Sequence, residues 1–274
     1  MFLLRGSDFP NDNATLRDAL AGSLLPLGLT APVMVLDGDF PSFSAIRLDV
    51  TGAHFQRGYR IAPASSEVKD SFFARSLEIK ATPAKFESLP FHVSLRADDC
   101  VFAFGTTEKN ERVATLRHCS GGTLEIAAGI PEIEASLLML ANEAASGFGA
   151  SVDSIRIVAE AETPRRIAIT VTAVAKAFMT KATLTLRGRL EIDDHFCARL
   201  RELTCNGDGM IANLAAGQLR PRLAEWERVS FPLAIELPAG LDFSYIALEA
   251  GPELKCRAAI RCANGGAHTP ATRE

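Results

Sequence analysis

Residues 183–192 read Thr-Leu-Thr-Leu-Arg-Gly-Arg-Leu-Glu-Ile, and polar and apolar side chains alternate along the whole stretch. Successive side chains of a β-strand point to opposite faces, so the pattern predicts a strand with one apolar and one polar face. At about 3.3 Å per residue this strand would be ~33 Å long, longer than an ordinary strand. Such a strand needs an equally long apolar element packed against its apolar face.

Three segments with apolar side chains at helical spacing supply that element. The first begins after a cap at Asp12 or Asn13 and ends near Leu27; the others span about 131–148 and 210–228. Further alternating segments follow one another with short gaps, which requires antiparallel pairing. These segments are 45–51, 75–81, 91–97, 154–159, 166–175, 198–204, 241–249 and 253–260.

The order of helices and strands therefore predicts an α+β fold, in which a strongly curved antiparallel sheet wraps around long helices. We expect one domain over residues 1–263 and a disordered polar tail over 264–274. Hydrophobic residues make up 47% of the chain, which is enough for a large core. The net charge of −4 is too weak to indicate a nucleic-acid partner.

Targeting signals are not evident in the chain. The first residues lack a basic leader with a sustained apolar stretch, and no run of about eighteen apolar residues predicts a transmembrane helix. These features predict a cytoplasmic protein. A periplasmic or envelope location is the alternative if a leader has been removed.

The C-terminal half resembles a known family of lipid-binding proteins. The resemblance lies in a long helix before Val-Asp-Ser-Ile-Arg-Ile at 152–157, the stretches 186–194 and 203–210, and Phe-Pro-Leu at 231–233. These features are similar to the bacterial LmeA-like phospholipid-binding proteins of the tubular lipid-binding (TULIP) superfamily. The resemblance implies a TULIP-like super-roll whose apolar groove, between helix and sheet, holds lipid acyl chains.

The function that follows is the binding of phospholipid or another long-chain apolar ligand, for holding or transfer, without covalent chemistry. No cofactor or metal is expected, and peripheral contact with a membrane is a further expectation. Ordinary core packing is the alternative explanation for each groove residue taken singly. The groove candidates are Leu137, Leu140, Ala141, Leu184, Leu186, Leu190, Leu214 and Leu219.

Two other functions remain open. The first is a hydrolase that uses His118 or Cys119, although adjacency in sequence does not establish a catalytic pair. The second is a structural or assembly protein whose groove is filled by its own side chains. Neither a nucleophile elbow nor a zinc-protease helix motif is present.

The polar clusters of the sequence are explained by turns and solvent-exposed surface without a catalytic or metal-binding role. The Asp193-Asp194-His195-Phe196-Cys197 stretch lacks the paired spacing of a zinc site and predicts a turn. Arginines at 187, 189, 199 and 201 alternate along two strands, which predicts a solvated sheet face; contact with lipid phosphates is the alternative. The six cysteines are widely scattered, so we expect free thiols.

Overall fold

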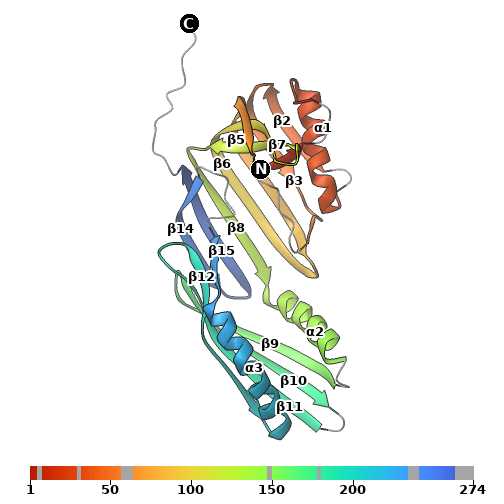
Figure 1. Ribbon diagram of the computed structural model, residues 1–274, viewed down its shortest axis with the longest axis vertical. Coiled ribbons are helices and arrows are strands. Elements are labelled where there is room, and N and C mark those ends of the chain that lie inside the picture. Colours follow the sequence, from red (N-terminus) through yellow and green to blue (C-terminus); the bar gives the residue numbers. More distant parts are fainter. Residues whose placement is uncertain are drawn as a thin grey trace.

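The computed structural model describes residues 1–4, 8–29, 32–56, 64–146, 150–177, 180–233 and 241–262. Strands hold 62% of these residues and helices 22%. Figure 1 shows two sheets arranged end to end, with one helix beside the first sheet and two beside the second. The tail expected at 264–274 lies outside the described residues.

The larger sheet has ten strands in the described chain and is mostly antiparallel. The order β14-β15-β8-β6-β5-β3-β2 forms its main path, β7 joins β6 to β1, and β4 pairs with β5. The pairs β3–β5 and β4–β5 are parallel. The strands are β1 (Phe2–Leu4), β2 (Val33–Asp39), β3 (Ser42–Asp49), β4 (His54–Phe55), β5 (Ser66–Phe86), β6 (Leu89–Thr106), β7 (Arg112–His118), β8 (Gly121–Gly129), β14 (Leu241–Ala250) and β15 (Glu253–Cys262).

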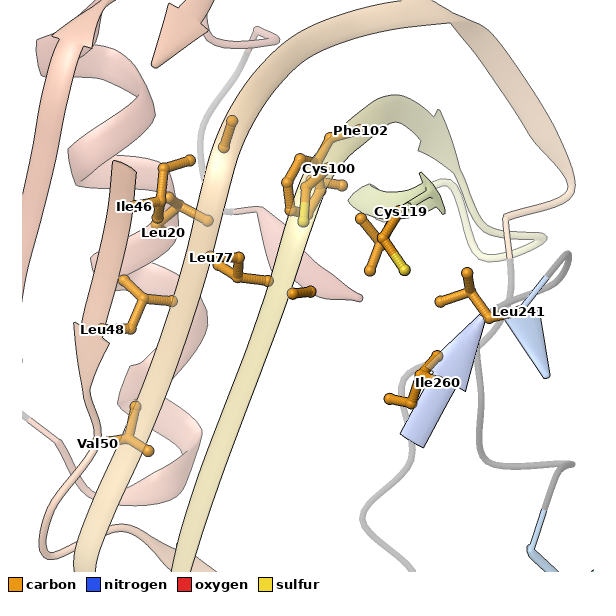
Figure 2. Packing of buried hydrophobic residues seen from close by; sticks show 14 of the residues in the cluster. Leu20, Ile46, Leu48, Val50, Leu77, Cys100, Phe102, Cys119, Leu241 and Ile260 are labelled. Atoms are coloured by element: carbon orange, nitrogen blue, oxygen red, sulfur yellow. The ribbon is translucent and has the colours of Figure 1, made fainter. Parts of the chain in front are cut away.

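The first helix, α1 (Asn13–Leu24), covers one face of this sheet and confirms the helix predicted there (Figure 1). Asp12 caps it by accepting a hydrogen bond from the Thr15 backbone N–H at 2.8 Å. Leu16 and Leu20 are fully buried and belong to the same hydrophobic cluster as Phe102 on β6. Figure 2 shows Leu20 beside the inward-facing side chains of the sheet.

The smaller sheet has five strands among the described residues, in the antiparallel order β13-β12-β11-β10-β9. The stretch 183–192 lies in its centre, in β11, which confirms the predicted strand. Val171 pairs with Leu186 on one side and with Ile157 on the other, so apolar side chains gather on one face. The strands are β9 (Ala150–Thr163), β10 (Arg166–Ala177), β11 (Thr180–Ile192), β12 (Cys197–Asp208) and β13 (Ser230–Pro232).

The two sheets meet at the turn between β9 and β10. The backbone N–H of Leu248 on β14 donates to the carbonyl of Pro164 in this turn at 2.6 Å. Ile167 and Ile192, at the near ends of β10 and β11, are buried in the same hydrophobic cluster as Leu248. The sheets therefore share one core where they meet.

The expected super-roll is wrong. The two remaining helices, α2 (Ile130–Ser146) and α3 (Met210–Arg228), lie beside the smaller sheet, and no described helix is enclosed by a sheet (Figure 1). An apolar stripe requires that a helix pack on something, but it does not distinguish packing inside a roll from packing along an edge. In α2 no side chain is fully buried despite its apolar composition.

Strands of the larger sheet are longer than the alternating segments predicted. Proline and glycine are common in turns, but Pro83 and Gly105 lie inside β5 and β6. Pairing of β5 with β6 shifts between Ala81 and Ala84, so Pro83 sits at a bulge where it need not donate a hydrogen bond to the ladder. The glycine pair at 121–122, a combination common in turns, begins β8.

Candidate functional site

Helix α2 lies along the open edge of β9. The Asn142 side chain accepts a hydrogen bond from the Val152 backbone N–H at 2.8 Å and donates one to the Val152 carbonyl at 2.9 Å. The Glu134 carboxylate accepts a hydrogen bond from the Ile157 N–H, also at 2.8 Å. Edge backbone groups that would be free to pair with another chain are thus satisfied by the helix.

Helix α3 covers β12 at the opposite side of the smaller sheet. Ala216 and Leu223 are buried against Cys205, and Leu184 and Leu186 of β11 pack against this cluster. At the far end of the helix, the Glu227 carboxylate accepts a hydrogen bond from the Leu203 N–H at 2.6 Å. The side of α3 that carries Glu227 therefore faces the β12 edge.

One apolar face of the sheet extends from α3 to the β9 edge, where α2 lies. Leu184 and Leu186 meet α3, and the register places Ile155 and Ile157 on the same face through Ala173 and Val171. Ile155 and Ile157 are buried although β9 is an edge strand, and α2 is the helix that packs on β9.

Apolar sheet surface remains between the two helices. Three strand spacings of ~4.8 Å separate β9 from β12 by ~14 Å, whereas helices in contact have axes ~8–10 Å apart. Val171, Ala173 and Leu184 are accordingly only partly buried. We call these side chains, with the helix flanks above them, the α2–α3 face.

The predicted residues of α2 lie on the flank turned away from the β9 edge. Ala141, Leu137 and Leu140 are ~100–160° around the helix from Asn142. Leu137 is 36% exposed and Leu140 46% exposed, so neither is covered by the rest of the chain.

The two predicted groove residues of α3, Leu214 and Leu219, lie on different sides of the helix. Leu219 is ~60° from the buried Ala216, on the flank opposite Glu227, and is 36% exposed. Leu214 is ~160° from Ala216 and 67% exposed, so it points away from the sheet. Leu190 packs against the core shared by the two sheets rather than between the helices. Leu214 and Leu190 are therefore not part of the α2–α3 face.

Two members of the face were not among the predicted residues. Val171 lies at the centre of β10, where its alternation with Thr170 and Thr172 was the available signal. Trp226 is 49% exposed on the same flank of α3 as Leu219, seven residues further along the helix. A spacing of seven residues, or two helical turns, is the sequence signal that indicates Trp226 as a neighbour of Leu219.

The opposite face of the smaller sheet is charged. A pocket of about 380 Å³ there is lined by Arg166, Arg189, Glu191, Arg201, Glu202 and Glu227. Arg189 pairs with Glu162 at 2.9 Å and also with Glu202. Hydrogen bonding to Arg166 lowers the pKa of Glu191. These ion pairs match the solvated face predicted from the arginine spacing.

Geometry at the other candidate motifs favours structural roles. Burial raises the pKa of the Cys119 thiol to about 11, and the His118 ring contacts Cys262 instead of Cys119. The Asp193 carboxylate accepts hydrogen bonds from the backbone N–H groups of His195 and Cys197, which forms the expected turn. Within the described ranges, no group of three or more His, Cys, Asp or Glu side chains is arranged to hold a metal ion.

None of the described helices combines the length and apolar character needed to cross a membrane. The chain matches no family model, no curated protein and no solved structure. The similarity to LmeA-like proteins therefore rests only on the residues that suggested it.

Proposed function

We propose that the α2–α3 face binds an elongated apolar ligand, such as the acyl chain of a phospholipid, without covalent chemistry. The observation that carries the proposal is a partly buried apolar strip of sheet that is bordered by two helices with half-exposed apolar side chains. Leu219 and Trp226 flank the strip from α3, and α2, with its half-exposed Leu137 and Leu140, borders the strip at the β9 edge. An uncovered apolar surface bounded by polar edges is typical of a binding site.

Dimensions of the face suit a long chain better than a compact ligand. The shorter helix, α2, has 17 residues and is ~25 Å long. Strands β10 and β11 extend further, at 12 and 13 residues. An extended chain lying along β10 and β11 would contact their apolar side chains along its length.

Burial of the ligand supplies enough free energy for useful affinity. Each methylene removed from water contributes ~0.8 kcal/mol, so twelve of them contribute ~10 kcal/mol before the cost of association. Covering the half-exposed leucines of the helices adds to this free energy, because the ligand removes their apolar surface from water. This balance favours holding or transfer of a lipid whose head group stays in solvent.

The direct test has two parts. Denaturing mass spectrometry of an organic extract of the purified protein should detect co-purified fatty acid or phospholipid. Binding of cis-parinaric acid, followed by its fluorescence, should then be weakened about tenfold by Leu219→Gln, since an amide replaces part of the apolar wall.

Leu214→Gln is the matched control, because Leu214 lies on the same helix, is more exposed and points away from the face. This variant should bind the probe as the unmodified protein does. A clean extract together with no probe binding, or equal losses in the two variants, would refute the proposal.

A further inference from the structure

A second chemical feature lies in the larger sheet, away from the α2–α3 face. His118 ends β7 and Cys262 ends β15, and the two residues are 144 positions apart in the chain. Folding brings the Cys262 Sγ to 2.9 Å from the His118 Nδ1. Both residues are partly exposed, so a small molecule in solvent can reach them.

Four of the other cysteines hold their protons more firmly. Burial raises the pKa of Cys100 to about 12 and that of Cys119 to about 11, and it also raises the pKa of Cys205 and Cys256. A thiol of raised pKa holds its proton, and the thiolate is the form that attacks an electrophile.

Cys197 is the closest structural counterpart of Cys262. It is also partly exposed, but within the described residues its thiol has the backbone carbonyl of His195 as its partner, at 3.8 Å. A carbonyl oxygen accepts a hydrogen bond from a thiol but does not take its proton. An imidazole nitrogen does both, as in nucleophile–base pairs of thiol enzymes.

We propose that Cys262 is a reactive thiol, with His118 as its proton acceptor, and that it exchanges with small-molecule disulfides. In the reaction the Cys262 Sγ attacks one sulfur of R–S–S–R while its proton passes to His118 Nδ1. The disulfide bond breaks, a Cys262–S–S–R bond forms, and the leaving thiolate takes the proton from His118 as R–SH. No net oxidant is needed beyond the disulfide itself.

This inference is independent of the proposed lipid binding, since the pair lies in a different sheet. The product would carry a polar group on the last described residue of β15, next to the shared core. Reduction by a second thiol would restore the starting state, so the modification is reversible.

The test compares labelling rates of individual cysteines in the full chain. Oxidised glutathione is added to the reduced protein, and peptide mass mapping follows each cysteine with time. Cys262 should form its mixed disulfide roughly tenfold or more faster than Cys197. The buried Cys100 and Cys119 should stay unmodified, which reports that the protein is folded during the reaction.

His118→Gln keeps a hydrogen-bonding side chain but removes the base. It should lower the rate at Cys262 to that at Cys197 and leave Cys197 unchanged. Equal rates at Cys262 and Cys197 in the unmodified protein would overturn the proposal, and so would an unchanged rate at Cys262 in a folded His118→Gln protein. If that variant exposes Cys100 and fails to fold, the ratio in the unmodified protein decides alone.

Discussion

The amide side chain of Asn142 holds α2 against β9, together with Glu134. Removing this amide gives the sharpest test of how α2 packs on the smaller sheet. In Asn142→Ala the two hydrogen bonds to the Val152 backbone, at 2.8 and 2.9 Å, are lost. Each hydrogen bond contributes ~0.5–1.5 kcal/mol to stability, so their loss costs ~1–3 kcal/mol. Alanine also favours the helix by up to ~0.7 kcal/mol, which offsets part of this cost.

Asn213→Ala isolates the hydrogen bonds from the helix propensity. Asn213 is an exposed residue of α3, and its amide makes none of the side-chain hydrogen bonds found in the described chain. Asn213→Ala therefore has the same gain in helix propensity but loses no hydrogen bond. Urea denaturation of the two variants should differ by ~2 kcal/mol, with Asn142→Ala the less stable.

Hydrogen exchange locates the effect. The Val152 amide should exchange faster in Asn142→Ala, because its acceptor is gone, whereas amides in the centre of β10 should keep their protection. Equal unfolding free energies for the two variants, or an unchanged exchange rate at Val152, would show that α2 is not fixed to β9 in this way.

Four other substitutions test the packing and the charged face. Phe102→Ala removes a buried ring stacked in the larger core and should destabilise the protein by ~3–5 kcal/mol in urea. Gly207→Ala would place a Cβ against the α3 backbone and should lower the unfolding free energy by ~1–3 kcal/mol, whereas Gly217→Ala meets open space within α3 and should raise it by ~0.8–1 kcal/mol. Arg166→Gln should raise the pKa of Glu191 towards the ordinary glutamate value, as measured by carboxyl NMR. Because the pKa of Glu191 is lowered in the folded state, this carboxylate stabilises the fold above its ordinary pKa, and that contribution is lost as the pH falls through the folded value. The variant should show a weaker acid dependence of stability, since Arg199 and Arg201 still lower this pKa.

Helices and strands were predictable from the sequence where the residues that determine them lie close together in the chain. The Asp12 cap, the alternation of 183–192 and the stripe of 210–228 each depend on residues a few positions apart, and each element is present. The long strands β5 and β6 were predicted only in pieces, because bulges accommodate Pro83 and other residues that usually end strands.

The position of the helices was not predictable from their apolar stripes. Ile133 and Leu137 are spaced as they would be for burial inside a roll, but α2 instead lies along an edge fixed by Asn142 and Glu134. Those bonds join residues 10 and 23 positions apart, and nothing in the local pattern indicates them. For the same reason Leu214 was grouped with Leu219, although only Leu219 has its side chain on the flank facing the sheet.

Photocrosslinking tests the central claim about the α2–α3 face most directly. A fatty acid with a diazirine on its chain is bound to the purified protein and irradiated, and the labelled residues are mapped by peptide mass spectrometry. The account predicts labels on the inner flanks of α2 and α3 and on Val171 or Leu184 of the strip between them. Labels confined to the charged opposite face or to the larger sheet, or no labelling that unlabelled fatty acid competes away, would contradict it.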